Sequence, residues 1–248
     1  MDQNELIIVT ATFFLAGIVK GATGMGLPTV AMGVLGSLLS PLTAATLLLV
    51  PSFVTNVWQI LAGPRLRPLL RRLWTMMAAV VFGTLIGASL LAGGDQGHTT
   101  VALGLTLVAY AAYTLLTAPK RVPPAVQPIA SPLVGLVTGL VTGATGVFVI
   151  PAVPYLQALQ LEKDELVQAL GLSFTVSTIA LAAALGLYGA LPAGNLVPSL
   201  LAVVPALLGM AAGQAIRRRI SAAAFRRGFL ACLLLLGCEM AFRPLLAA

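Results

Sequence analysis

The stretch GIVKGATG (residues 17–24) recurs as GLVTGATG (residues 139–146), 122 residues further along the chain. After the leading glycine, five of the other seven positions are identical. Glycine lets a backbone bend without interference from a Cβ atom, so each copy predicts a break in regular structure. Because the copies lie near the starts of the two halves of a 248-residue chain, they predict an internal duplication.

Composition limits the class of protein in which this duplication folds. Apolar residues make up 59% of the chain and charged residues 8%, whereas a soluble domain carries roughly a quarter charged residues. This excludes a soluble enzyme, a secreted disulfide scaffold and a disordered chain. Apolar runs of about 20 residues favour an all-α polytopic membrane protein over a barrel. The net charge of +7 then indicates orientation in the membrane, and we expect no nucleic-acid partner.

Two further matches support the duplication. Ser52-Phe53 corresponds to Ser173-Phe174 at an offset of 121, and Gly83-xxx-Gly87 to Gly209-xxx-Gly213 at 126. GxxxG alone is weak support, because small residues recur wherever membrane helices pack closely. Three matches in the same order predict two homologous membrane repeats within one integral membrane domain. We expect these repeats to be residues 1–120 and 121–248.

Apolar runs divide the chain into eight hydrophobic blocks, whose connectors carry twelve basic residues. The blocks are residues 6–39, 41–62, 73–92, 99–117, 129–156, 166–188, 195–216 and 225–246. The basic residues are Arg65, Arg67, Arg71, Arg72, Lys120, Arg121, Lys163, Arg217, Arg218, Arg219, Arg226 and Arg227. If every block crosses once, six basic residues fall on each side. If the block 129–156 enters and leaves on the same side, all twelve fall together, as basic residues in short cytoplasmic loops do.

The block 129–156 is therefore predicted to be a re-entrant pair of short helices broken at Gly143–Gly146, because irregular backbone at membrane depth must be buried or line a cavity. Internal homology predicts the same for the first block, as Leu6–Lys20, a break and Pro28–Leu39. The charge count does not test the first block, which is either re-entrant or a single broken span. With two hairpins, each half has three full spans, and this odd number makes the repeats inverted.

The two glycine breaks are the first candidates for a binding site. Each break is expected to start a short helix, whose free N–H groups and positive dipole end can hold an anion. The candidate residues are Thr23, Gly24 and Gly26 in the first break and Thr145 and Gly146 in the second. The alternative interpretation is that the glycines allow crossing helices to pack closely. The presence of two copies in symmetric positions favours the binding site over this alternative.

Lys20 is the most informative single residue. It lies fourteen residues after Leu6, about 21 Å along a helix, and therefore past the middle of a hydrocarbon core about 30 Å thick. A charge there costs at least ~2.5–3.5 kcal/mol, so Lys20 should face a wet cavity or a partner. It is either an attractor for an anion or half of a structural ion pair with Glu239, although Arg243 lies at i+4 from Glu239. The second half has Thr142 at this position, so the site is asymmetric in charge.

Polar residues on two later spans extend the predicted site. They are Asn56 and Gln59 in the second block and Ser173, Ser177 and Thr178 in the sixth. They line a cavity beside each break or join helices by hydrogen bonds, and the sequence favours neither. No HExxH, GxGD or Ser–His arrangement indicates an enzyme, and no acidic cluster indicates a metal. We expect no catalytic residue and no cofactor.

Three stretches resemble a known family of membrane permeases. GIVKGATGMGLPTVAM (17–32) and GLVTGATGVFVIP (139–151) resemble the duplicated glycine-rich signature of the TauE/SafE family, and GMAAGQAIRRRISAAAFRRGFLACLLLL (209–236) resembles its C-terminal pattern. The resemblance implies an anion permease with seven or eight spans, from a family associated with export of sulfite and organosulfonates. Phe148 replaces a signature glycine, which predicts that the side of the site formed by the second copy is bulkier or drier. The matching glycines are Gly17, Gly21, Gly24, Gly26, Gly139, Gly143 and Gly146.

The sequence therefore predicts a secondary transporter for a small anion (sulfite, an organosulfonate or a small carboxylate) in the inner membrane, with its basic loops cytoplasmic. We expect the anion to lie between the breaks, near Lys20, Thr23 and Thr145. An inside-negative potential favours anion exit by ~2.3 kcal/mol per charge per 100 mV, which favours export. A passive anion channel and a non-transporting membrane partner subunit are the alternatives. The packing glycines make contacts either within one chain or between two chains, so a homodimer is also an alternative.

Overall fold

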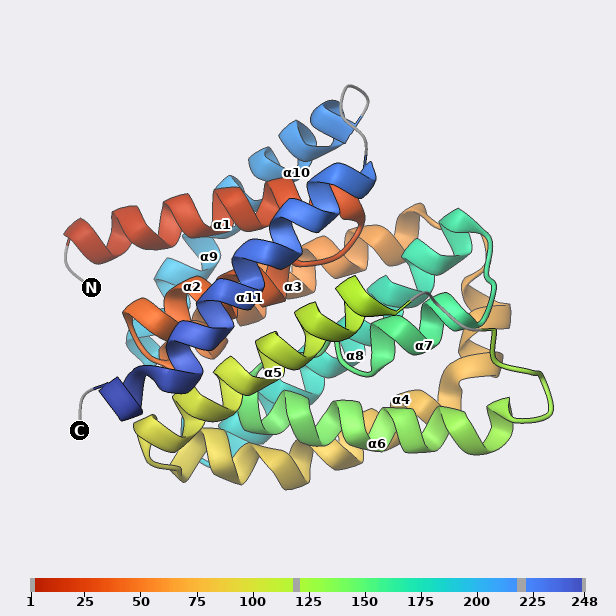
Figure 1. Ribbon diagram of the computed structural model, residues 1–248, viewed down its shortest axis with the longest axis horizontal. Helices are drawn as coiled ribbons and strands as arrows, with labels where there is room; N and C mark the ends of the chain where they lie inside the picture. Colours follow the sequence, from red (N-terminus) through yellow and green to blue (C-terminus); the bar gives the residue numbers. More distant parts are fainter. Residues whose placement is uncertain (1–2, 118–120, 218–221, 247–248) are drawn as a thin grey trace.

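The computed structural model describes residues 3–117, 121–217 and 222–246, and every regular element within these ranges is a helix (Figure 1). Within the described residues, seven segments are long and apolar enough to cross a membrane. They are α1 (Gln3–Thr23), α3 (Pro41–Ala62), α4 (Leu66–Gly93), α5 (Gln96–Leu116), α6 (Gln127–Thr145), α8 (Lys163–Leu187) and residues Ala193–Ile216. The remaining helices are α2 (Leu27–Leu38), α7 (Ala152–Ala158) and α11 (Ala222–Leu246). The chain is an all-α polytopic membrane protein, as predicted.

The predicted single span 195–216 is bent. It consists of the short helix η1 (Ala193–Asn195), α9 (Leu196–Leu201) and α10 (Val203–Arg217). Pro205 lies four residues after Leu201 and has no N–H to donate to its carbonyl, so the regular ladder is interrupted near Ala202.

Each glycine-containing block forms a long helix, a break and a short helix. The first arms, α1 and α6, have 21 and 19 residues, and the second arms, α2 and α7, have 12 and 7. The expectation of two short helices is therefore wrong for the first arm of each pair. Most signature glycines lie inside the long helices, and the chain turns only at Gly24, Gly26 and Gly146, where φ is +82°, +104° and +71°.

Both hairpins return to the side from which they start. In the second hairpin, the Val122 N–H before α6 donates to the Ala158 carbonyl at the end of α7, at 3.0 Å. In the first, the beginning of α1 and the end of α2 lie toward the same side of the molecule (Figure 1). The starts of α4, α6, α8 and α11 lie toward the opposite side (Figure 1).

The basic residues of the described connectors gather at that opposite end. Arg72 on α4 contacts Gln127 at the start of α6, and Arg65 pairs with Glu165 at the start of α8 at 3.3 Å. Lys120, Arg218 and Arg219 lie outside the described residues, as do the side chains of Arg217 and Arg226. The basic residues with described side chains at this end are Arg65, Arg67, Arg71, Arg72, Arg121, Lys163 and Arg227.

Two pairs of helices pack through glycines. A Cβ atom at Gly83 on α4 would lie 2.4 Å from the Leu136 carbonyl oxygen on α6, and one at Gly209 on α10 would lie 2.0 Å from the Phe14 oxygen on α1. The GxxxG glycines therefore make close contacts within one chain. The first helix of each predicted half packs against the GxxxG helix of the other half. The division into two repeats itself remains a prediction.

The centre of the bundle is formed by α3 and α8. Among the candidate spans, these two have the largest shares of buried residues in their most apolar 18-residue stretch, 56% and 67%. Ser40 starts α3 by accepting a hydrogen bond from the Thr43 N–H at 3.1 Å, with Pro41 in the first turn. Pro51 lies inside α3 and cannot donate to the Leu47 carbonyl. Ser199 of α9 donates to that carbonyl instead, at 2.8 Å, so the helix continues through the proline.

Candidate anion-binding site

Lys20 lies on α1 with its side chain directed into the bundle and is 1% exposed. Its Nζ donates to Thr55 Oγ1 at 3.1 Å and to Asn56 Oδ1, both on α3. No carboxylate among the described residues pairs with Lys20. Glu239 pairs instead with Arg243, at 3.0 Å. The Lys20–Glu239 ion pair considered from the sequence is therefore not formed, and neutral groups alone surround this ammonium in the described structure.

The hydrogen bonds continue from Lys20 across the centre of the bundle. Asn56 Nδ2 donates to Ser52 Oγ at 3.0 Å, and Ser52 Oγ lies 3.2 Å from Thr178 Oγ1 on α8. All of these side chains are buried. We call Lys20, Ser52, Thr55, Asn56 and Thr178 the Lys20 cluster. It joins α1, α3 and α8, so a movement between these helices must break or exchange its hydrogen bonds.

The local sequence of α3 explains the geometry of the cluster. Ser52 and Asn56 lie four residues apart and Thr55 three residues after Ser52, so all three approach the same face of the helix. An ammonium carries three N–H donors and no acceptor. Lys20 has two hydrogen-bond acceptors in the described structure, the oxygens of Thr55 and Asn56, and neither carries a negative charge. An anion is the chemical species that would best complete this arrangement.

The first glycine break lies one helical turn from the cluster. Gln59, three residues after Asn56, donates through Nε2 to the Gly24 carbonyl at 2.7 Å. Gln59 Oε1 is buried and has no hydrogen-bond partner in the described part of the chain. The Thr23 hydroxyl lies 2.8 Å from the Val19 carbonyl oxygen and 2.7 Å from that of Met25, and its single hydrogen can be donated to either, which holds the turn. The structure thus places Gly24 and Gln59 beside the Lys20 cluster.

The helix predicted to follow the first break is present. Gly26 is the N-cap of α2, which begins at Leu27. Pro28 occupies one of the first positions and has no N–H, so fewer free amides are available for an anion than an unbroken first turn would offer.

The second break does not start a helix directly, and that part of the prediction is wrong. Helix α7 begins at Ala152, six residues after Gly146, and has only 7 residues. The intervening segment is Val-Phe-Val-Ile-Pro, and the residue before a proline avoids the α-helical conformation. Phe148 is buried against Phe174, with ring centroids 5.3 Å apart, so an aromatic contact fills the position where the first break has Gly26.

The second break also lies away from the Lys20 cluster. A Cβ atom at Gly146 would meet Met32 at 2.8 Å and Ala45 at 3.4 Å. Ala45 precedes Asn56 by eleven residues, about 16 Å along α3. Helices α1 and α6 run in opposite directions (Figure 1), so their breaks fall toward opposite ends of α3. A small anion cannot contact both breaks at once in this conformation.

The second-half candidates are buried and uncharged. The Thr145 hydroxyl donates to the Val141 carbonyl at 2.7 Å, and the Thr142 hydroxyl to the Thr138 carbonyl at 2.7 Å. Ser177 Oγ is fully buried and has no partner in the described residues. Ser173 on the preceding turn of α8 has the same status. The structure therefore gives α8 two unpartnered hydroxyls close in sequence to Thr178 of the cluster.

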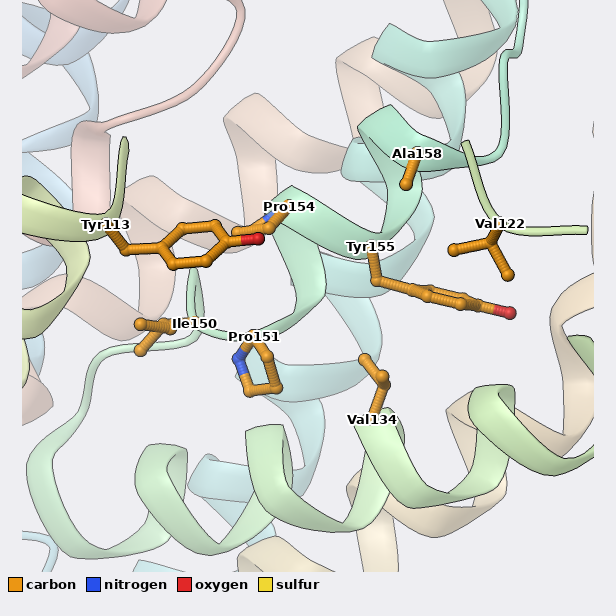
Figure 2. A pocket seen from close by; sticks show the side chains of 8 residues that line it. All are labelled: Tyr113, Val122, Val134, Ile150, Pro151, Pro154, Tyr155 and Ala158. Carbon is orange, nitrogen blue, oxygen red and sulfur yellow. The ribbon is translucent and has the colours of Figure 1, made fainter. Parts of the chain in front are cut away.

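A cavity of about 360 Å³ lies behind the second break, between α5, α6 and α7 (Figure 2). Its described walls are apolar apart from two tyrosine hydroxyls, and no charged side chain is among the described lining residues. This lining does not suit an anion, because desolvating a charge beside apolar groups is costly. The lining residues are Tyr113, Val122, Val134, Ile150, Pro151, Pro154, Tyr155 and Ala158.

Thr55, like Ser52, is a cluster member that the sequence analysis does not propose for the site. Its signal was available, because it lies one residue before Asn56 and four before Gln59 on a span otherwise rich in leucine and valine. Threonine inside a helix commonly donates to its own preceding turn, as Thr55 does to the Pro51 carbonyl at 2.7 Å. Its second role, as an acceptor for Lys20, depends on how α1 is rotated against α3.

Comparison with known proteins gives one result. The family described as Sulfite exporter TauE/SafE matches residues 9–240, which is nearly the whole chain. None of the curated proteins and none of the solved structures compared matches it.

Proposed function

Since the chain belongs to the sulfite exporter TauE/SafE family and is a multi-pass membrane transporter, we propose that it carries a small anion out of the cell across the inner membrane. The anion is sulfite, an organosulfonate or a small carboxylate. We propose no enzymatic activity, because the family consists of membrane transporters.

The buried ammonium of Lys20 is the observation that carries the proposal. A charge removed from water is costly unless an opposite charge compensates it. Lys20 has only neutral partners, Thr55 and Asn56, in the described structure. A bound anion would compensate the charge, and a hydrogen bond to a charged group contributes ~1.5–3 kcal/mol. The Lys20 cluster is therefore proposed as the centre of the substrate site.

The first break is proposed to form the near wall of this site. Gln59 and the Gly24 carbonyl lie next to the cluster, and Gln59 Oε1 needs a donor. A protonated oxygen or an ammonium on the substrate could supply that donor. Thr23 shapes the turn through its hydrogen bond with the Met25 carbonyl, and Gly26 does so through its positive φ of +104°.

The second break is proposed to join the pathway in another conformation. The hydroxyls of Thr142, Thr145 and Ser177 make no hydrogen bond to the Lys20 cluster in the described structure, and Gly146 lies beside Met32 and Ala45. Transporters built from inverted repeats expose one site alternately to the two sides. We propose that the predicted halves exchange conformations in this way, so that the second-half residues line the route on the other side.

The burial of Lys20 supports a carrier over a passive channel. At 1% exposure, the Lys20 side chain is closed off from bulk solvent, so a conformational change must precede substrate entry or release. An open channel would instead give an ion continuous access to its attractor. A channel is the second candidate function, and a partner subunit without transport activity is the third.

The end that carries the basic residues is proposed to be cytoplasmic. Basic residues are enriched in short cytoplasmic loops, and the described arginines and lysines of the connectors gather at this end. Export then needs no coupling ion, because an inside-negative potential drives an anion outward by ~2.3 kcal/mol per charge per 100 mV.

Reconstituted vesicles test the proposed function. Charge movement and chemical release would both be measured for sulfite, sulfoacetate, taurine, lactate and chloride, with protein-free vesicles as the control. The proposal expects saturable movement of sulfite, sulfonates or a carboxylate, and little of chloride. Non-saturating movement of every anion would favour the channel. The absence of both signals for the whole panel would favour the partner subunit.

A further inference from the structure

A second cavity, of about 300 Å³, lies at the basic end of the bundle, between the start of α4, the segment before α6 and the first turns of α6. Arg72, Trp74, Pro124, Gln127 and Ser131 contribute to its wall. It differs from the cavity of Figure 2 because a fixed cation lines it. The Lys20 cluster has no member among its lining residues, so the transport site does not account for it.

Gln127 holds the guanidinium of Arg72 in position. Arg72 Nε and Nη2 donate to Gln127 Oε1 at 3.2 and 2.9 Å, and Gln127 Nε2 donates to the Val122 carbonyl at 3.3 Å. Both ends of the amide are therefore used, which fixes its orientation and with it that of Arg72.

The charge of Arg72 is not neutralised by this arrangement. Arg65 and Arg243 pair with Glu165 and Glu239, whereas the partner of Arg72 is a neutral amide and no described carboxylate pairs with it. A guanidinium has five N–H donors in a planar fork. Two are given to Gln127, and the others remain for an oxygen-rich anion, to which arginine binds with high geometric specificity.

Trp74 places the cavity at the level of lipid headgroups. Trp74 is 64% exposed and follows Arg72 by two residues, where the apolar part of α4 begins. Tryptophan is enriched at this depth because its ring has an apolar body and one N–H. Ser131, which also lines the cavity, is buried, and its hydroxyl lies 2.6 Å from the Tyr155 hydroxyl.

We propose that this cavity binds the phosphate of an anionic phospholipid headgroup, with Arg72 as its principal contact. Phosphate oxygens match the free donors of the guanidinium, and a lipid delivers them at the depth that Trp74 marks. Inorganic phosphate has the same chemistry but would arrive from water without using Trp74. The lipid would contact α4, α6 and the segment that joins the two predicted halves, and would stabilise them against each other.

Thermal unfolding of the purified, delipidated protein tests the proposal. Phosphatidylglycerol, phosphatidylcholine or inorganic phosphate would be added to the wild type and to Arg72→Gln. The matched control is Arg71→Gln, which removes the same charge from an exposed neighbouring residue. Phosphatidylglycerol near saturation is expected to raise the Tm of the wild type and of Arg71→Gln by about 5 °C, and that of Arg72→Gln by much less.

Gln127→Glu provides a second variant that keeps every cation. A carboxylate at this position would pair with Arg72, so the stabilisation by phosphatidylglycerol should fall although Arg72 remains. Equal stabilisation of all four proteins by phosphatidylglycerol would overturn the proposal. Equal stabilisation by phosphatidylcholine, whose headgroup has the same phosphate but no net charge, would overturn the assignment to an anionic lipid. An equal, Arg72-dependent effect of inorganic phosphate would overturn the assignment to a lipid.

Discussion

Lys20 shows which property of a single residue a sequence reveals and which it does not. Its distance along the first apolar run predicts that it lies at membrane depth, and the structure buries it. Its partners could not be predicted, because Glu239 and Asn56 were both polar residues in predicted spans. The rotation of α1 against α3 selects Thr55 and Asn56, and that rotation depends on the glycine contacts of α1 with α10. The consequence is a buried cation with neutral partners.

Asn56→Asp tests whether this missing negative charge matters. The new carboxylate would lie beside the Lys20 ammonium and neutralise it within the protein. Transport of the anion at subsaturating concentration is expected to fall at least ~10-fold, since a charged hydrogen bond contributes ~1.5–3 kcal/mol. Flux into vesicles would be measured together with thermal stability. Asn195→Asp, on a residue that contacts Thr46 far from Lys20, is the matched control. Unchanged flux in Asn56→Asp would contradict the role given to Lys20.

At the scale of helices, the repeated glycines have two different functions. Gly17, Gly21, Gly139 and Gly143 lie inside α1 and α6 and allow backbones to touch, whereas Gly24 and Gly146 turn the chain at positive φ. The motif predicts a break in both halves, and a break is found in both. It could not give the position of each turn, because the same residue type serves packing and turning.

The shorter second hairpin has a cause that is visible in the sequence. Pro151 and the β-branched residues before it delay α7, whereas Leu27 follows the first break directly. The prediction treated the two breaks as equivalent because their motifs match. The difference arises after the motif, where internal homology is weak. The two breaks therefore differ in the helix that they start.

The packing role of Gly139 leads to a stability prediction. A Cβ atom there would lie 2.3 Å from the Val80 carbonyl oxygen, so α4 and α6 would have to separate. Gly139→Ala is expected to lower the free energy of unfolding by ~1–3 kcal/mol. Gly228→Ala in α11, where no atom of the described residues lies within 4 Å of the added Cβ, is the matched control and should leave stability unchanged or slightly raised. Equal melting temperatures for the two variants would show that α4 and α6 do not pack as described.

For the whole molecule, the arrangement of the helices brings the described basic connectors to one end of the bundle. The sequence count predicts that the basic connectors share one side if the block 129–156 returns, and the hydrogen bond from Val122 to Ala158 shows that its two ends lie together. The first block returns as well, although its lack of connector charges left this open. Nothing in the sequence gave the pairing of α1 with α10 or of α4 with α6, because such contacts depend on the complete bundle.

Cysteine labelling tests the proposed orientation. Asp95 lies between α4 and α5, and Glu162 lies between α7 and α8 at the opposite end, and both are exposed. In a background with Cys232→Ala and Cys238→Ala, a membrane-impermeant maleimide should label Asp95→Cys in intact spheroplasts. It should label Glu162→Cys only after lysis. The reverse pattern would place the basic end outside the cell.

The central claim is that the Lys20 ammonium binds the transported anion, and the most direct test compares two identical substitutions. Lys20→Gln removes the buried ammonium, and Lys163→Gln removes an exposed one at the start of α8. Saturable sulfite or sulfonate flux would be measured in vesicles with equal amounts of folded protein. We predict that Lys20→Gln lowers flux at least ~10-fold and that Lys163→Gln matches the wild type. Wild-type flux in Lys20→Gln would contradict the account and leave Lys20 with a structural role only.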